Sequence, residues 1–360
     1  DDLEVRQLAD LESLTAAVPN VTFNRYLGQA RLFVRGLGND TTIPTAEGRV
    51  AYHIDGFYIS RNSVAMGTFY DVDRVEIIRG PQGTLYGRNA TAGAANVITR
   101  KPTREFDGYA TVQFGNYNLR SADFALGGPL TEDLSGRFAM QMTDRGGYGK
   151  NLITGNDIDA SSTGSARASL LWEPSATTDF LFTVDHHREQ DSNYAAHYNG
   201  PQSGESRIPV AMAALYGGSV SPDPRDINSD RDPRNKRETT GATVEATFDL
   251  SDNWTLKSLS GYRGSSYAWD TDLDGTQVAL APYGQAEKSD QYSQEFQLHY
   301  NSDRLNAVLG AYAFKEDAYG RVYILLQSAT APPSFLTQGY RLAGDVKTTA
   351  GAIFGELTYD

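Results

Sequence analysis

The second half of the chain is dominated by segments in which apolar and polar residues alternate. Residues 242–250 place alanine, valine, phenylalanine and leucine at every second position, and residues 292–300 show a similar alternation. Because successive side chains of a strand point to opposite faces, each segment predicts a strand with one apolar and one polar face. We expect about ten such strands, near residues 108–116, 119–128, 134–145, 162–173, 177–189, 237–250, 253–266, 287–301, 304–322 and 341–360.

The connections between these strands alternate between short and long. The short ones are residues 129–133, 174–178, 251–253 and 302–303, and the long ones are residues 146–161, 190–236, 267–287 and 323–339. Only the first hairpin, at residues 116–118, is short where a long connection is expected. A two-sheet sandwich has no reason to gather its long loops at one end, whereas a transmembrane β-barrel has short turns on one side and long loops on the other. Segments of ten or more residues also match a tilted membrane crossing.

The first hundred residues have a different pattern. A helical spacing of leucines is followed by short strands, a hairpin dipeptide Asp55-Gly56, and two strands that flank a glycine-dense loop. The expected elements are a helix at residues 7–18, strands at 31–35, 49–60, 72–79 and 95–99, and turns between them. We therefore predict a small α+β domain at residues 1–104 and a mainly β, partial transmembrane barrel at residues 105–360.

Composition excludes several classes of protein. The 360 residues are 39% hydrophobic and contain no run of 18 apolar residues, which excludes a helical membrane protein. There is no cysteine, so disulfides, thiolate metal sites and cysteine catalysis are excluded. The net charge of −13 argues against nucleic-acid binding.

Enzyme motifs are not evident. The glycines at 83 and 87 lack the spacing and the lysine of a phosphate-binding loop, and a strand rather than a helix is expected after them. His186 and His187 are neighbours on a strand, so they point to opposite faces and do not chelate one metal together. No Ser-His-Asp pattern or nucleophile elbow stands out. We therefore expect a protein that is not an enzyme and has no catalytic residues.

One acidic run has the spacing of a calcium loop. Asp270, Asp272 and Asp274 precede Gly275, which matches the first half of a loop in which carboxylates converge on calcium. The twelfth position is Ala281 instead of glutamate, so the motif is incomplete. A second run with the same spacing lies at residues 226–232. The two readings are a solvated acidic loop and a structural calcium site, and no other cofactor is expected.

Arginines of the first domain need partners if that domain sits inside a barrel, because a buried arginine is costly when unpaired. The polar faces of the predicted strands offer glutamates at positions 245, 295 and 356. The arginines in question are Arg35, Arg74 and Arg79. They either pair with these inward glutamates or donate to backbone carbonyls.

The glycine-dense region resembles the plug-domain signature of TonB-dependent outer-membrane receptors, in particular the siderophore-receptor-like branch. The motifs that carry the resemblance are Val34-Arg35-Gly36-Leu37-Gly38, His53-Ile54-Asp55-Gly56-Phe57-Tyr58, Val72 to Gly87 with Arg79-Gly80-Pro81-Gln82-Gly83 at its centre, and Asn96-Val97-Ile98-Thr99. The match covers about the first hundred residues. Segments such as Ser293-Gln294-Glu295 and Phe354-Gly355-Glu356-Leu357 also resemble barrel pieces of that family.

The resemblance implies a 22-stranded barrel closed by an N-terminal plug, in the outer membrane of a Gram-negative bacterium. It implies TonB-dependent import of a scarce nutrient, a ferric siderophore above all, with outer-membrane lipid and the TonB–ExbB–ExbD complex as partners. Arginines of the plug motifs pair with barrel glutamates in such receptors, so we predict a latch of Arg35 and Arg79 with Glu295 and Glu356. The plug motif would comprise Gly36, Gly80, Pro81, Gly83 and Gly87.

Alternatives to siderophore import remain open at this point. They are uptake of an oligosaccharide, cobalamin or aryl compound, a surface-binding barrel that does no transport, and a barrel hydrolase. The cargo is not readable, because loop aromatics such as Tyr198 and Trp269 suit a siderophore, a sugar or the lipid interface equally. Only ten strands are predicted and no TonB box is seen, so we expect this chain to be part of a longer receptor.

Overall fold

The structure is a computed structural model of the chain. It describes residues 18–26, 29–38, 43–66, 69–192, 195–200, 214–326 and 338–359. The predicted helix at residues 7–18 lies almost wholly outside these ranges. No helix in the described part of the chain is long and apolar enough to cross a membrane.

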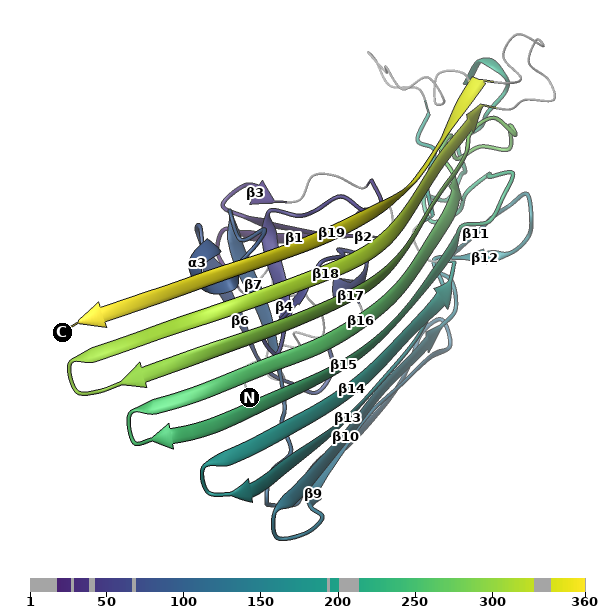
Figure 1. The fold of residues 1–360 in the computed structure, drawn as a ribbon. Helices are drawn as coiled ribbons and strands as arrows, with labels where there is room; N and C mark the ends of the chain where they lie inside the picture. The colour runs from purple at the N-terminus through teal and green to yellow at the C-terminus, as the bar shows by residue number, and fades with distance from the viewer. Residues whose placement is uncertain are drawn as a thin grey trace.

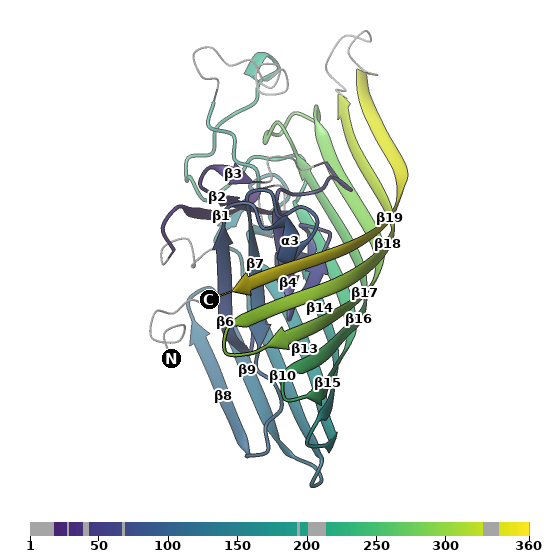
Figure 2. The ribbon, with the colours of Figure 1, turned by 60° about the vertical axis from the view of Figure 1, so that its left-hand side comes forward.

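The largest element is a ten-stranded antiparallel sheet in which sequence neighbours pair, in the order β19-β18-β17-β16-β15-β14-β13-β10-β9-β8. The sheet is strongly curved, and the N-terminal domain lies on its concave side (Figures 1 and 2). Its strands are β8 (Asp107–Gly115), β9 (Leu119–Pro129), β10 (Leu134–Arg145), β13 (Ser161–Ser175), β14 (Thr178–Asp191), β15 (Arg234–Ser251), β16 (Trp254–Asp272), β17 (Pro282–Asn301), β18 (Leu305–Leu326) and β19 (Gln338–Tyr359). Short β11 (Gly149–Lys150) and β12 (Asp157–Ile158) pair within the loop after β10.

The N-terminal domain contains two small sheets. The first has the order β1-β2-β3 and the second has the order β5-β4-β7-β6, with β4 and β7 parallel. Its elements are β1 (Val21–Tyr26), β2 (Gln29–Val34), β3 (Leu37–Gly38), β4 (Val50–Ile54), β5 (Phe57–Ile59), the 3₁₀ turn η1 (Val64–Met66), β6 (Val72–Arg79), α3 (Gly83–Tyr86) and β7 (Gly93–Thr99).

The hairpin between β4 and β5 turns at the predicted dipeptide. Asp55 and Gly56 both have positive φ, +49° and +79°, as a two-residue hairpin turn of the primed type requires. The Asp55 carboxylate fixes the turn by accepting hydrogen bonds from the Thr99 N–H and hydroxyl, each at 2.8 Å. Burial raises the pKa of Asp55, and the Thr99 bonds oppose that effect. The dipeptide thus ties the hairpin to the end of β7.

The two faces of the large sheet differ as the alternation predicts. On β17, Glu287 and Gln291 are buried against the N-terminal domain, whereas Tyr292 and Phe296 are 51% and 48% exposed on the opposite face. The register places Glu295 opposite Tyr312 on the inner face. An apolar outer face and a polar inner face suit strands with lipid on one side and protein or water on the other.

The ten predicted strands are confirmed, and the corrections concern their ends. β16 continues to Asp272 and β17 begins at Pro282, so the connection between them is much shorter than the predicted residues 267–287. β13 to β18 all begin or end outside the predicted bounds. The large sheet begins at Asp107, close to the predicted boundary at residue 104. The glycine-dense loop also contains the helical turn α3, which the sequence did not indicate.

Gly261 allows the N-terminal domain to approach β16. A Cβ atom at this position would overlap the ring of Phe57, which is 2% exposed at the tip of the hairpin, and Leu259 packs on the same core. We expect Gly261→Ala to destabilise the docked domain by about 1–3 kcal/mol through overpacking. Chemical denaturation followed by a probe in the N-terminal domain measures the change. Gly344→Ala is the control, because a Cβ there meets no described residue within 4 Å, and equal stability of both variants would contradict the prediction.

Candidate functional site

The N-terminal domain is held against β17 and β18 by a buried ion pair between Arg61 and Glu316. Their side chains are 2% and 1% exposed, and both guanidinium Nε and Nη2 donate to the carboxylate, the Nε bond measuring 2.6 Å. The hydroxyls of Ser60 and Ser289 each donate to the same carboxylate at 2.6 Å. Gln291 accepts from the Ser60 N–H at 3.1 Å. We call Ser60, Arg61, Ser289, Gln291 and Glu316 the Arg61 cluster.

Two residues of β17 make further hydrogen bonds to the N-terminal domain. Glu287 accepts from the Ser63 hydroxyl at 2.8 Å and from the Thr45 N–H at 2.7 Å. The Gln291 amide donates to the Tyr58 carbonyl at 2.5 Å. These hydrogen bonds therefore join two separate loops of the N-terminal domain to β17.

The interaction with Glu316 keeps the buried guanidinium of Arg61 charged. Burial by itself lowers the pKa of Arg61, but the hydrogen bonds and charge of Glu316 outweigh it and raise the pKa above its ordinary value. Arg61 is therefore charged at any physiological pH. Removing either partner would leave the other as an uncompensated buried charge.

A second buried ion pair holds the domain at the other side of the sheet. Arg137 on β10 donates to Asp71 through Nε at 2.7 Å and Nη2 at 2.6 Å, and through Nη1 to Asp107 on β8 at 2.8 Å. Arg167 on β13 lies over the Tyr70 ring at 4.4 Å. We call these five residues the Arg137 cluster. It binds the N-terminal domain and the first strand of the sheet to a single guanidinium.

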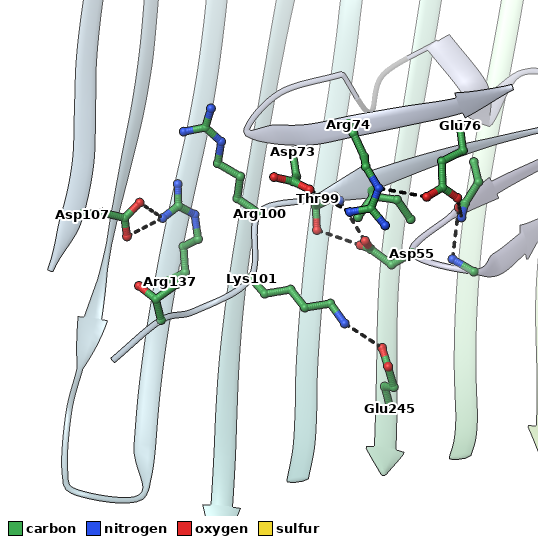
Figure 3. Close-up of a pocket in the computed structure, with 14 residues that line it drawn as sticks. Asp55, Asp73, Arg74, Glu76, Thr99, Arg100, Lys101, Asp107, Arg137 and Glu245 are labelled. Carbon is green, nitrogen blue, oxygen red and sulfur yellow. Dashed lines mark hydrogen bonds and ion pairs between the residues drawn. The ribbon is translucent and has the colours of Figure 1, made fainter. Parts of the chain in front are cut away.

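A charged cavity of about 890 Å³ lies beside the Arg137 cluster, and Asp107 and Arg137 are among its lining residues. Figure 3 shows Lys101 extending to Glu245 of β15, with Nζ and Oε2 3.2 Å apart, and Arg74 beside Asp73 and Glu76. Glu245 thus faces the domain, as the alternation predicted. Acidic and basic side chains both line the cavity, so it does not favour a ligand of one charge sign. Its geometry is that of a solvated gap beneath a docked domain.

His53 on β4 is buried, 5% exposed, and burial lowers its pKa to about 4. A histidine with a folded pKa below its unfolded value of about 6.5 contributes stability that is fully present above pH 6.5 and is lost as the pH falls toward 4. We expect the N-terminal domain to lose about 3 kcal/mol from this residue between pH 7.5 and pH 4. His53→Gln should remove that part of the dependence in denaturant unfolding. His186→Gln, at an exposed histidine, is the control, and identical pH profiles for the His53 variant and the wild type would contradict the assignment.

The predicted latch residues are not brought together among the described residues. Arg35 and Arg79 are exposed and form no side-chain ion pair in this part of the chain. Glu295 lies on the inner face and accepts from Gln297 at 2.5 Å, and Glu356 also lies on the inner face by register but is exposed. The inward orientation of both glutamates agrees with the sequence pattern. The latch itself stays a prediction.

The three aspartates of the predicted calcium loop do not converge. Asp270 accepts from the Tyr323 hydroxyl at 2.6 Å, while Asp272 and Asp274 are buried together and accept from nearby N–H and hydroxyl groups such as those of Thr276. Burial raises the pKa of Asp274. No group of three acidic or histidine side chains suited to a metal occurs in the described ranges. Calcium binding by this loop stays a prediction.

The second acidic run has a structural role in the described loops. Asp232 accepts from Asn151 at 2.9 Å, from Thr154 at 2.6 Å and from Asn156 at 2.6 Å. The main chains of the two loops also meet where Asn151 bridges Ile227. The loop before β15 therefore packs on the loop after β10.

Sequence reasoning missed Arg61, Asp71, Arg137 and Glu316. Glu316 and Arg137 occupy inward positions of alternating strands, which is the signal that selects them as a class. Nothing local distinguishes Arg61 from the other arginines of the domain. Asp71 has a positive φ of 49°, a conformation that only the folded structure reveals.

Comparison with known proteins agrees with this geometry. Residues 1–94 match the family model of the TonB-dependent receptor plug domain. The iron-regulated outer membrane virulence protein of Vibrio cholerae is 31% identical over 157 residues, which cover 40% of this chain and 24% of that protein. The ferric enterobactin receptor PirA of Pseudomonas aeruginosa is 33% identical over 148 residues, covering 36% of this chain and 20% of that protein. The matched region is thus about a quarter or less of these curated relatives.

Nearly the whole of this chain matches the fold of part of a solved receptor. The ferric yersiniabactin uptake receptor FyuA of Yersinia pestis superposes with a TM-score of 0.65 at 15% identity, covering 99% of this chain and 60% of that one. At this identity the likeness shows the fold. The described part of the chain therefore has the fold of part of that receptor, and residues 1–94 match the family model of the TonB-dependent receptor plug domain.

Proposed function

We propose that the protein imports a ferric siderophore across the outer membrane of a Gram-negative bacterium, driven by the TonB–ExbB–ExbD complex. The observation that carries the proposal is the docking of the plug domain on the concave face of the sheet by polar clusters. A domain that must move for transport needs contacts that hold it firmly but separate without exposing a large hydrophobic core. PirA of Pseudomonas aeruginosa is a ferric enterobactin receptor and the Vibrio cholerae relative is an iron-regulated outer membrane protein, which supports this cargo.

The strands are suited to this role. β18 and β19 each contain 22 residues, whereas a tilted crossing needs about 9–11. The excess length carries the outer loops away from the membrane, where a large ligand can be bound. TonB-dependent receptors are transport proteins, and we propose no catalytic activity for this one.

Uptake of radiolabelled iron tests the proposal. A strain that lacks the receptor gene and carries the full-length gene on a plasmid is supplied with a panel of ⁵⁵Fe-siderophores. We expect accumulation of at least one of them, and we expect it to be abolished in a matched strain without functional TonB. Binding without TonB-dependent accumulation would instead indicate a surface-binding barrel. If the strain showed TonB-dependent uptake of a labelled oligosaccharide, cobalamin or an aryl compound and no uptake of iron, that compound would be the cargo instead of a ferric siderophore.

A further inference from the structure

A second cavity, of about 480 Å³, lies between the plug domain and the inner faces of β17, β18 and β19. Its volume is within the range of small-molecule sites. Side chains from both parts of the molecule line it, including His53, Tyr58, Tyr86, Arg88, Glu295 and Tyr312. It differs from the charged cavity of Figure 3 in having several aromatic rings and small residues in its walls.

Three buried polar atoms of the lining residues have no hydrogen-bond partner within the part of the chain that the structure describes. They are His53 Nδ1, Arg88 Nη1 and the Tyr312 hydroxyl. Buried polar groups in folded proteins are nearly always bonded, and each exception needs an explanation. These three come from a plug strand, a plug loop and a sheet strand, and all border one cavity. Their arrangement indicates that the cavity takes up an occupant that carries hydrogen-bonding groups.

The aromatic residues that line the cavity favour a flat occupant. The His53 ring lies 5.6 Å from the Tyr58 ring and 5.4 Å from the Tyr86 ring, at steep angles to both. Aromatic side chains in such edge-to-face groups favour a further ring in an offset or edge-on position. Arg88 uses Nη2 to pair with Glu47, so Nη1 is left for an oxygen of the occupant. Glu295 offers an acceptor for a hydroxyl group.

We propose that this cavity binds a planar aromatic group that carries hydroxyl or carboxylate oxygens. The ring lies against His53, Tyr58 and Tyr86, and the oxygens are bonded by Arg88, the Tyr312 hydroxyl and His53. The role of this site in import rests on the proposed function. In that role, an aryl group of the cargo binds in the cavity while the cargo passes between the plug domain and the sheet. An intact ferric complex would need the plug to move first.

The test uses the full-length receptor in detergent micelles with 2,3-dihydroxybenzoate as the probe and cyclohexanecarboxylate as the non-aromatic comparison. Isothermal titration measures affinity, and a bromine-labelled dihydroxybenzoate is located by anomalous diffraction. We expect the aryl probe alone to bind, with bromine in the cavity. His53→Phe keeps a ring but removes Nδ1, and it should weaken binding about tenfold, the effect of one hydrogen bond.

A cavity-filling variant gives the matched comparison. Ala352→Trp adds bulk inside the cavity from β19, whereas Ala343→Trp on the same strand lies away from the lining residues. Binding should be lost in the first variant and kept in the second. Equal affinity in both, bromine elsewhere, or no binding of the probe at millimolar concentration would each overturn the site. Because His53→Phe is a conservative change, it keeps the test valid if Ala352→Trp misfolds.

Failure of this inference is distinguishable from failure of the proposed function. If ⁵⁵Fe uptake is TonB-dependent and the probe does not bind, only the cavity site is wrong. If the probe binds in the cavity and no cargo is accumulated, the aryl site stands and the import proposal is wrong.

Discussion

Replacing Arg61 by alanine is expected to destabilise the docked plug domain by about 3–5 kcal/mol, because Glu316 would remain as an uncompensated buried charge. Its carboxylate would keep only the hydroxyls of Ser60 and Ser289. Hydrogen exchange of plug amides, measured by mass spectrometry on the purified receptor, should rise across β4 and β5. In cells, a loosened plug should increase sensitivity to large antibiotics that the outer membrane normally excludes.

Two comparison variants separate the ion pair from loss of side-chain bulk. Arg74→Ala removes another arginine of the same domain, but its pairs with Asp73 and Glu76 are exposed, so the cost should be below about 1 kcal/mol. The double replacement Arg61→Met with Glu316→Met removes both charges and should recover most of the stability lost in Arg61→Ala. If Arg61→Ala and Arg74→Ala had the same small effect, the assigned role of the Arg61 cluster would be wrong.

Replacing Arg137 by alanine should have an effect of similar size. One guanidinium satisfies two carboxylates, and its removal leaves Asp71 buried without a cation, which costs about 3–5 kcal/mol. Asp71 also accepts through its carbonyl from the Arg100 N–H at 3.0 Å, so the disturbance should reach the end of β7. The first strand, β8, loses its contact with the plug through Asp107.

Hydrogen exchange at residues 69–74 and 107–115 measures this change. Arg104→Ala is the matched comparison, because Arg104 is 61% exposed and pairs with Glu173 at the surface. Protection should fall in both segments for Arg137→Ala and stay unchanged for Arg104→Ala. Protection that falls only in β8 would indicate that the Asp71 contact does not hold the domain.

The strands could be predicted because lipid on one face and the lumen on the other require apolar and polar residues to alternate, and this alternation is visible in the sequence. The prediction failed at the outer strand ends, where β16 and β17 run on to Asp272 and from Pro282. Beyond the membrane both faces meet water or loops, so the alternation that marks a strand is no longer required. The helical turn α3 was missed because four residues are too few for a periodic signal.

The candidate site was predicted only in part. Alternation selected the inward positions, and Glu245 and Glu295 lie there as expected. Which plug residue meets which inward residue depends on how two folded units fit together. That fit depends on features such as the close approach of Phe57 to Gly261, which leave no local pattern. The arginines chosen from the glycine motifs were therefore not those that the structure pairs with glutamate or aspartate.

The segment between Arg61 and Asp71 has a mechanical consequence for the sheet. Its two ends are bound to β18 and β10, with five strands between them in the sheet order. Six strand spacings of about 4.8 Å make about 29 Å along a flattened sheet, and ten residues span at most about 33–36 Å when fully stretched. The two ion pairs and the chain between them therefore link β18 to β10 across the concave face. Flattening the wall would lengthen the path between the two ion pairs, so we expect these pairs to limit how far the sheet can open.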